Sequence, residues 1–406
     1  MKTLHSLLNS FAGCKPRMIT QLHRLCEVNS GTENLKGLST LLQMLKEAFE
    51  PVADDTQVLS FPPTPMVTMQ GERKTHQYGQ ALWIRKRPHL KRRVLLMGHM
   101  DTVYSETSPF QQLTYLDEHR LNGPGVADMK GGLIILLEAL KAFETLPVAS
   151  TLGWDVLINA DEEIGSTASS AFYEEIANKY SLGLVYEPSL NANGDLAKNR
   201  RGNGKLTLIA TGKTAHAGRA FDQGRNAICY LAEALLEIKA LNDLKKDVTI
   251  NVGKIAGGDA LNMVPDKAVV KMDVRIADPD DEHWVFHQLN EMIDRLKRPD
   301  YSLTLEGGFG RPVKRVNEST RRLFQEIQTI EESFGRQINW EDSGGCCDGN
   351  NLAKHGLAVI DTLGARGGSI HTPDEYIILD SLVERASLST VLLSRLAEGL
   401  LEELQP

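Results

Sequence analysis

The chain has 406 residues, more than one domain usually holds, so two hydrophobic cores are expected. Hydrophobic residues make up 41% and charged residues 24%, which is the composition of an ordinary soluble globular protein and excludes a disordered chain. The formal net charge of -8, with no basic run longer than 91–93, argues against a nucleic-acid partner.

The N-terminal segment and the cysteines bear on location. Polar side chains within residues 1–14 interrupt any apolar core of a signal peptide, and the longest apolar run, 133–137, is far shorter than a membrane span. The five cysteines are an odd number without CxxC spacing, which suits a reducing cytoplasm. Cys346 and Cys347 are adjacent, and because neighbouring thiols make strained disulfides and poor chelates, we expect no metal or redox role for them.

Helices and strands alternate in the first part of the chain. Residues 17–49 are expected to form a helix pair around the turn 29–32, and residues 129–143 a further helix. Short apolar runs, typical of strands buried on both faces, lie at 94–97, 154–159 and 182–186. This alternation indicates a mainly parallel sheet flanked by helices, which binds its ligands beyond the carboxyl ends of the strands.

The order of elements changes between about residues 203 and 309. Strands are expected there at 205–210, 248–255, 268–276 and 302–305. One helix is expected after the first strand, at 225–241, and another after the third strand, at 281–296. This βαββαβ order is ferredoxin-like and predicts an inserted second domain at 203–309, between two parts of the first domain, 1–202 and 310–406. A helix, a strand and a helix then resume the first pattern, at 318–334, 359–363 and 382–403.

His99 and Asp101 stand at the carboxyl end of the first apolar strand, in the sequence GHMDTV. Side chains two residues apart on an extended segment point the same way. One of the two can bind a metal ion while the other accepts the second ring N–H of the histidine. Taken alone, the pair also fits a surface histidine beside an aspartate.

Acidic residues follow at two further positions. Asp128, in GPGVADMKGG, could cap the helix that follows it or bridge two cations with its two oxygens, and the two roles are compatible. Glu162 and Glu163, in NADEEIGS, come directly after a buried strand, so they are expected in the same crevice as His99. Neighbouring glutamates diverge, which allows one to bind metal and the other to transfer protons.

Glu187 and His371 complete the set of ligand-type residues, after the strand 182–186 and after a glycine-rich loop. Each residue alone has an ordinary structural explanation, but five of them converge on one predicted rim. A mixture of imidazole and carboxylate is favoured by zinc, and two bridged zinc ions activate water for hydrolysis. GxSxG, HExxH and GxGxxG motifs are absent from the sequence, which leaves serine hydrolases, zincins and Rossmann dehydrogenases without support.

Seven motifs in the same order resemble the co-catalytic zinc exopeptidase family of glutamate carboxypeptidase, aminoacylase, acetylornithine deacetylase and succinyl-diaminopimelate desuccinylase. They are GHMDTV, GPGVADMKGG, NADEEIGS, Glu187-Pro188, TGKTAHAG, LNMVPDKAVVKMDVR and HTPDEY, spread over about residues 90–395. The glutamate carboxypeptidase branch is the most similar, on RGNGKLTL, GGFGRP, Asp348-Gly349-Asn350 and DEYIILDSL. The resemblance implies a zinc exopeptidase-like catalytic domain with a lid and dimerisation domain inserted in it.

The resemblance also implies two Zn²⁺ per subunit, with Co²⁺ or Mn²⁺ as other metals that such a site accepts. His99, Asp128 and Glu187 would bind one ion. Asp128, Glu163 and His371 would bind the other, so that Asp128 bridges.

Further roles follow from the resemblance for residues outside the ligand set. Asp101 would orient His99, and Glu162 would be the general base. His216 would stabilise the oxyanion, in this family usually in the site of the partner subunit of a homodimer. Asn262 and Arg275 would hold the carboxylate of the substrate.

Three functions are compatible with these residues. The first is a carboxypeptidase that releases a C-terminal amino acid, of glutamate type, from a small peptide or an N-acyl conjugate. The second is a deacylase of N-acyl amino acids, suggested by Glu187, because relatives with Glu at this position are often deacylases. The third is a metal-binding scaffold without turnover. Relatives often carry small hydroxyl residues or glycine where this chain has Cys346 and Cys347. The resemblance therefore does not determine which side chains form the wall of the substrate pocket.

Overall fold

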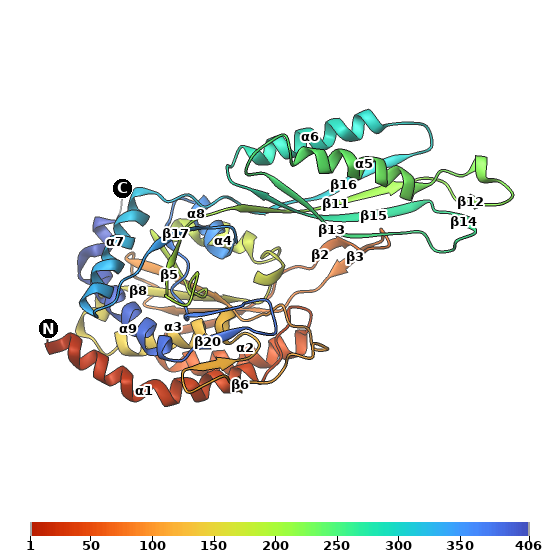
Figure 1. Ribbon diagram of the computed structural model, residues 1–406. Helices are drawn as coiled ribbons and strands as arrows, with labels where there is room; N and C mark the ends of the chain where they lie inside the picture. Colours follow the sequence, from red (N-terminus) through yellow and green to blue (C-terminus); the bar gives the residue numbers. More distant parts are fainter. Residues whose placement is uncertain (1, 405–406) are drawn as a thin grey trace. The chain divides into compact units, whose positions relative to one another are not determined.

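The computed structural model describes residues 2–404, and the side chains of residue 11 and of 13–404. Residues 1, 405 and 406, at the outer ends of the first predicted domain, lie outside the described residues. So do most side chains of residues 1–14, the segment that we considered as a signal peptide. The chain forms two compact units, of which the first comprises Met1–Pro62, Tyr78–Arg200 and Lys314–Pro406, and the second Pro63–Gln77 and Arg201–Val313 (Figure 1).

A six-stranded sheet, in the order β1-β4-β8-β5-β9-β18, is the centre of the first unit. Its strands are β1 (Asp55–Leu59), β4 (Ala81–Lys86), β5 (Arg93–His99), β8 (Gly153–Asn159), β9 (Leu182–Val185) and β18 (Ala358–Ile360). The last four in this list pair in parallel, whereas β1 and β4 are antiparallel. The four predicted apolar strands are thus confirmed, and the sheet is mainly parallel as expected; β1 and β4 were not predicted.

Helices cover both faces of this sheet. The described helices of the first unit are α1 (Lys2–Cys26), α2 (Leu35–Phe49), α3 (Gly132–Phe143), α4 (Ser170–Ile176), α7 (Glu318–Ser333), α8 (Asp348–Lys354), α9 (Asp380–Arg395) and α10 (Leu401–Glu403). Alternate side chains of β5 belong to different cores: Val94 and Leu96 pack with α1, α2, α3, α7 and α9, and Leu95 and Met97 pack with α4 and α8 (Figure 1). Burial on both faces explains the continuous apolar run of this strand.

The helix boundaries differ from the predicted ones in two places. The first helix already begins at Lys2 rather than at residue 17. The helix α3 begins at Gly132 rather than at residue 129, after the turn Val126–Gly131. Asp128 has non-helical dihedral angles inside this turn, so it does not cap α3. Of its two expected roles, that of a carboxylate that bridges two cations is the one left.

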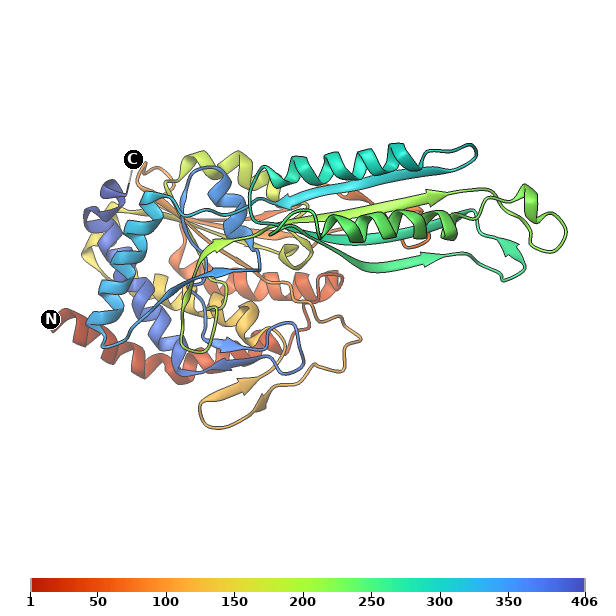
Figure 2. The ribbon, with the colours of Figure 1, turned by 45° about the horizontal axis from the view of Figure 1, so that its top comes forward.

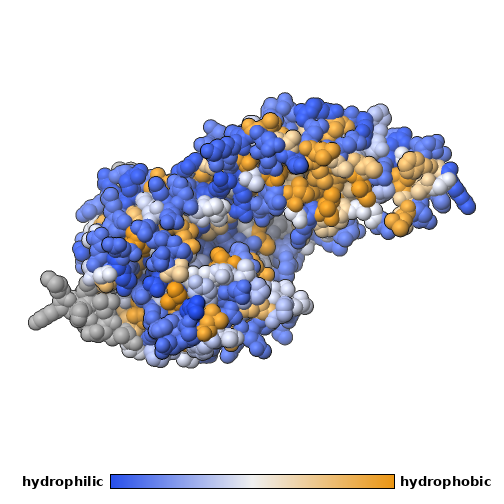
Figure 3. Space-filling model, in the orientation of Figure 1, coloured by the Kyte–Doolittle hydropathy of each residue, from blue (hydrophilic) through white to orange (hydrophobic). Residues whose placement is uncertain are grey.

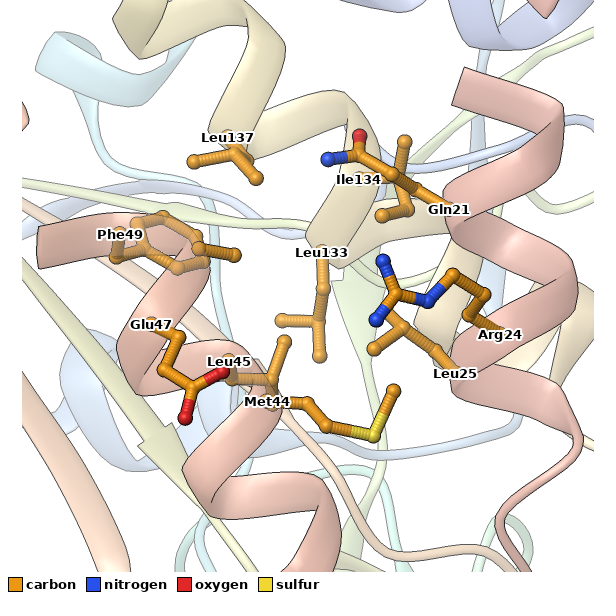
Figure 4. Close-up of a pocket in the computed structure, with 11 residues that line it drawn as sticks. Gln21, Arg24, Leu25, Met44, Leu45, Glu47, Phe49, Leu133, Ile134 and Leu137 are labelled. Atoms are coloured by element: carbon orange, nitrogen blue, oxygen red, sulfur yellow. The ribbon is translucent and has the colours of Figure 1, made fainter. Parts of the chain in front are cut away.

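Short strands complete the first unit. The strands β6 (Thr114–Tyr115), β7 (Arg120–Asn122), β19 (Gly367–Gly368) and β20 (Tyr376–Ile378) form a small sheet in the order β19-β20-β7-β6, and β10 (Leu196–Arg200) pairs with β17 (Trp340–Ser343). An apolar cavity of about 230 Å³ lies between α1, α2 and α3, with Arg24 and Glu47 among its lining side chains (Figure 4). None of the described helices is long and apolar enough to cross a membrane.

The second unit has the predicted ferredoxin-like order. Its elements are β11 (Gly202–Thr211), α5 (Ala227–Leu241), β13 (Thr249–Gly257), β15 (Lys267–Ile276), α6 (Asp281–Leu296) and β16 (Ser302–Arg311). The strands form an antiparallel sheet in the order β13-β15-β11-β16. The two helices lie side by side along one face of the sheet, and their apolar side chains share one core with it (Figure 2).

Two short antiparallel pairs belong to the same unit: β12 (Ala215–His216) with β14 (Met263–Val264), and the hairpin of β2 (Thr64–Val67) with β3 (Arg73–His76). The second pair lies in the segment Pro63–Gln77, which we had expected in the first domain. It packs with the second unit because Arg73 forms an ion pair with Glu306 on β16, and because Gly71 lies against Lys267 and Val269 on β15.

Candidate metal centre

Three of the predicted ligands stand at the carboxyl ends of adjacent strands in the first unit. His99 is the last residue of β5. Glu163 lies in the one-turn helix Glu162–Ile164 that follows β8, and Glu187 comes two residues after β9. Because β8, β5 and β9 are parallel neighbours in this order, their carboxyl ends share one edge of the sheet, as the sequence predicted.

The other two ligands lie on loops of the same unit. Asp128 is in the turn that precedes α3 and that begins after Gly125, whose φ of 75° favours a residue without a side chain. His371 follows β19 and itself has a positive φ of 63°. A non-glycine residue in this conformation costs free energy, so the surrounding loop must hold His371 in place.

The structure brings all five side chains together around Asp128. Its Oδ1 lies 3.2 Å from Nε2 of His99, and its Oδ2 lies 3.1 Å from Nε2 of His371. Glu187 Oε2 is 3.7 Å from the same nitrogen of His99, and Glu163 Oε2 is 3.3 Å from that of His371. Each oxygen of Asp128 therefore faces its own histidine, and each of these histidines has its own glutamate beside it.

These distances fit two cations. Tetrahedral bonds of about 2.0–2.2 Å place neighbouring ligand atoms about 3.3–3.6 Å apart. Glu187 Oε1 is buried without a hydrogen-bond partner among the described residues, which is costly unless a cation binds there. Glu162 also lies close, since one of its oxygens is within 4.8 Å of ligand atoms of His99 and Glu187.

Asp101 holds the strand end and the acidic turn together. It is fully buried, and Nδ1 of His99, on the side of the ring that faces away from Asp128, lies 3.0 Å from its backbone carbonyl oxygen and 3.4 Å from its Oδ1. Its carboxylate also accepts hydrogen bonds from the backbone N–H groups of Glu162 and Glu163, at 3.3 and 3.2 Å. The residue therefore has the contacts that its expected orienting role needs.

The pKa values in the chain without cations reflect this crowding. Hydrogen bonds with Asp128 and Glu163 raise the pKa of His371 to about 11. Burial and the charge of Asp128 raise the pKa of Glu163 to about 7. Burial would lower the pKa of His99, but Glu187 and its other acidic neighbours raise it well above the ordinary value. Bound cations would compensate the charges of these carboxylates in place of protons.

Metal binding should therefore release protons. The pKa of both histidines lies above its ordinary value in the metal-free chain, and a histidine must be neutral to bind a metal ion, so we expect metal binding to release protons. The affinity for metal ions should rise with pH. The rise should be steepest below the pKa of Glu163, where a proton on this carboxylate also competes with the metal ions. Calorimetric titration with Zn²⁺ in two buffers of different ionisation enthalpy measures the release. A binding heat that is independent of the buffer would contradict the prediction.

Glu375, four residues after His371, ties the ligand loops together, and the sequence did not reveal this. Its buried carboxylate accepts hydrogen bonds from the backbone N–H groups of Gly125, Ala127 and Asp128 at 3.0–3.2 Å. It also accepts one from the hydroxyl of Tyr104 at 2.9 Å. The three loops that carry His99, Asp128 and His371 thus meet at one carboxylate.

Replacing Glu375 by glutamine should weaken metal binding. The amide keeps the size of the side chain, but its NH₂ group must face N–H or O–H donors, so the loop of Asp128 loses part of its support. Loss of such supporting contacts typically weakens metal affinity by about 10- to 100-fold. Competition with a fluorescent chelator measures the affinity, and Asp374→Asn, on the exposed neighbouring residue, is the matched control. Equal affinities in both variants would refute the supporting role.

The three other predicted site residues lie in the second unit. His216 and Asn262 are close together and exposed: the backbone N–H of Ala217, next to His216, donates to the carbonyl of Asn262 at 2.9 Å. Arg275 lies elsewhere, near the end of β15, where it is paired with Asp273 at 2.6 Å. Cys346 and Cys347 are not joined by a disulfide, and the Cys347 side chain accepts a hydrogen bond from the backbone of Asn350 at the start of α8.

Comparison with known proteins decides the family. The sequence model of peptidase family M20/M25/M40 matches residues 95–395, most of the chain. The chain belongs to this family. It is thus a hydrolase that acts on amide bonds, as predicted, and the alternative of a scaffold without turnover is set aside.

Two curated relatives and one solved structure illustrate the range of the family. Carboxypeptidase G2 of Pseudomonas sp. (strain RS-16) is 29% identical over 75% of this chain and 74% of its own. Succinyl-diaminopimelate desuccinylase of Pseudoalteromonas translucida is 29% identical over 77% of this chain and 86% of its own. A family metallo-carboxypeptidase from Sulfolobus solfataricus shares the fold with a TM-score of 0.69 at 17% identity, covering 94% of this chain and 99% of that one.

Proposed function

We propose that the protein is a dinuclear zinc carboxypeptidase that releases a C-terminal amino acid, of glutamate type, from a small peptide or an N-acyl conjugate. The observation that carries the proposal is the position of Asp128, with one oxygen toward His99 and the other toward His371. His99, Asp128 and Glu187 would hold one ion, and Asp128, Glu163 and His371 the other. The similarity to carboxypeptidase G2 supports the reaction class.

Glu162 is the group that we assign to proton transfer. Divalent cations in this centre would polarise the scissile carbonyl and lower the pKa of the attacking water. Glu162 is half-buried beside the ligand atoms without belonging to either proposed ligand triad. It can take the proton of the water and pass it to the leaving nitrogen, as a general base and then a general acid.

A substrate panel tests the reaction. The zinc-loaded enzyme should hydrolyse dipeptides and N-acyl conjugates that end in glutamate faster than it hydrolyses N-acetyl or N-succinyl amino acids with basic side chains. The opposite order would favour the deacylase, which the similarity to the desuccinylase and the presence of Glu187 keep open as the second candidate. Loading separate samples with Zn²⁺, Co²⁺ and Mn²⁺ identifies the metal that gives the highest kcat.

The second unit supports a homodimer with shared sites. His216 and Arg275 lie toward opposite ends of its sheet, because Thr211 pairs with Lys267 and Asn203 pairs with Arg275. Eight residues of strand separate the two pairs, which is about 26 Å. One chain therefore cannot offer both residues to the same small substrate. Two chains can, if His216 and Asn262 come from one and Arg275 from the other.

The surface of the second unit offers a face for such a dimer. The strand β13 pairs only with β15 among the described strands, so its other edge is open. Large apolar side chains are exposed on this strand and on α5, namely Ile228, Leu236, Val252 and Ile255. Figure 3 shows apolar side chains gathered over this unit. An open apolar strand edge is a typical surface for pairing with a second chain. This unit is then the lid and dimerisation domain.

Mixed dimers test the shared site. His216→Ala should lower kcat by about 10²- to 10³-fold, the usual cost of one oxyanion contact. When this variant is mixed with the inactive Glu162→Gln variant, half of the dimers contain both chains, and each of these has one site with intact Glu162 and His216. We expect recovery of about a quarter of the wild-type activity. No recovery after verified chain exchange would place His216 in the site of its own chain.

We also propose a cytoplasmic location. The cysteines of the chain are all without disulfides, as expected in a reducing compartment.

A further inference from the structure

A polar cavity of about 320 Å³ lies in the first unit, and none of the proposed metal ligands lines it. Three of its lining side chains are arginines and two are glutamates: Arg336, Arg366, Arg385, Glu331 and Glu384. The arginines come from three different segments, which are the chain after α7, the loop before His371, and α9. We call this site the arginine cavity.

Each guanidinium of the arginine cavity is only partly paired. Arg366 Nη1 lies 3.2 Å from Glu384, Arg336 Nε pairs with Glu331, and Arg385 Nη2 donates to the carbonyl of Gly194. One nitrogen on each arginine is buried and without a hydrogen-bond partner among the described residues: Nε of Arg366, Nη2 of Arg336 and Nη1 of Arg385. These three nitrogens are buried too deeply for an anion in the cavity to reach them, so the other nitrogens of the lining arginines are the donors that an anion would contact.

The charges of the wall point to an anion. Three guanidinium groups face two carboxylates, which leaves one positive charge in excess. Arg385 forms the floor with only 3% of its surface exposed, while the side chains of Arg366 and Arg336 are 24% and 26% exposed, respectively. Asp195 lies outside the wall, where Asn191 and the backbone of Asn339 hold its carboxylate, and its charge also interacts with Arg385.

Burial and the neighbouring cations act on the pKa of Arg385 in the same sense. Burial lowers the pKa of Arg385, Glu331 and Glu384 oppose this, and the cations of Arg336 and Arg366 lower it further. Gly194 has a φ of 98°, and a Cβ there would lie 2.4 Å from Nη2 of Arg385. The loop thus needs glycine at this position to let the guanidinium approach its backbone.

We propose that the arginine cavity is a binding site for a phosphate-type oxyanion. A planar carboxylate is satisfied by one bidentate arginine. Guanidinium groups from three segments instead surround a tetrahedral group, whose charge of about -1.5 to -2 at neutral pH exceeds that of one carboxylate. The cavity has room for such an anion and several waters, at about 30 Å³ per water.

The site lies next to two segments that carry proposed metal ligands. Gly194 is in the loop that follows Glu187, and Arg366 is five residues before His371 in the chain. An anion bound between Arg366 and Arg385 would hold the loop that follows Glu187 and the segment before His371 in fixed positions. This consequence rests on the proposed metal centre, whereas the anion site itself does not.

Calorimetric titration of the metal-loaded enzyme with inorganic phosphate at constant ionic strength tests the proposal. We expect saturable binding and a higher Tm. Arg366→Gln and Arg385→Gln should weaken binding by about 10- to 100-fold, the usual value of a charge-assisted hydrogen bond. Glu384→Gln removes a negative charge from the wall and should tighten binding. Arg322→Gln, on an exposed arginine of α7, is the matched control and should bind phosphate like the wild type.

The outcomes separate the arginine cavity from the metal centre. Because Arg385 is buried, the Tm of each variant without phosphate shows whether it folds, and Arg366→Gln remains informative if Arg385→Gln does not. Phosphate binding that is unchanged in Arg366→Gln would place the anion at the metal ions and overturn the proposal. Absence of binding at millimolar phosphate, equally tight binding of acetate, or weaker binding in Glu384→Gln would also overturn it. None of these measurements depends on turnover.

Discussion

Replacing Glu162 by glutamine should remove hydrolysis and leave the metal content unchanged. The amide has nearly the same shape as the carboxylate but cannot accept a proton at neutral pH. General acid–base catalysis by one side chain contributes about 10²- to 10⁴-fold, so we expect kcat to fall by this amount. Glu162 belongs to neither proposed ligand triad, so both ions should remain. Metal analysis and kcat on the best substrate of the panel are the two measurements.

The control for this experiment is Glu174→Gln, on an exposed glutamate of α4 that forms an ion pair with Lys354 at 3.4 Å. It should show wild-type kcat and metal content. If Glu162→Gln instead lost one ion, Glu162 would be a ligand, an arrangement that its distance to His99 and Glu187 permits. If kcat stayed at the wild-type level, another group would have to move the proton.

The sequence predicted the strands that carry the ligands because their burial leaves a local signal. Both faces of β5 and β8 are covered, so most of their residues are apolar. The edge strand β1 has no such run, since it contains Asp55, Thr56 and Gln57 and is largely exposed or half-buried. The hairpin β2–β3 is similar: nothing in its two short, largely exposed strands indicates which of the two cores it joins.

The candidate site was predictable where side chains do the chemistry, and not where the backbone does. The ligand-type residues stand in short motifs after strands, which made their convergence visible. Glu375 lies in one of the same motifs, but three of its four donors are backbone N–H groups about 250 residues earlier in the chain. Every non-proline residue has such a group, so the sequence contains no sign of the contact. The arginine cavity also depends on three distant segments.

Asparagine at position 128 should remove both metal ions, because one side chain serves both proposed triads. The amide keeps the size of Asp128 but lacks its charge, and its NH₂ group would point at one of the two histidines. We expect kcat to fall by more than the about 10²- to 10³-fold that a single electrostatic contact is worth. Glu187→Gln and His371→Ala each affect one triad only, so each should retain about one ion per chain.

Metal counts and thermal unfolding together distinguish a bridge from an ordinary ligand. A cation stabilises the folded chain by mass action, so a chelator should lower the Tm of the wild type. The same chelator should leave the Tm of Asp128→Asn unchanged, because that variant has no ion to lose. If Asp128→Asn kept one ion and lost only as much Tm as Glu187→Gln or His371→Ala, Asp128 would serve one cation. In that case the two oxygens of Asp128 would face two histidines, at 3.2 and 3.1 Å, only in the metal-free site.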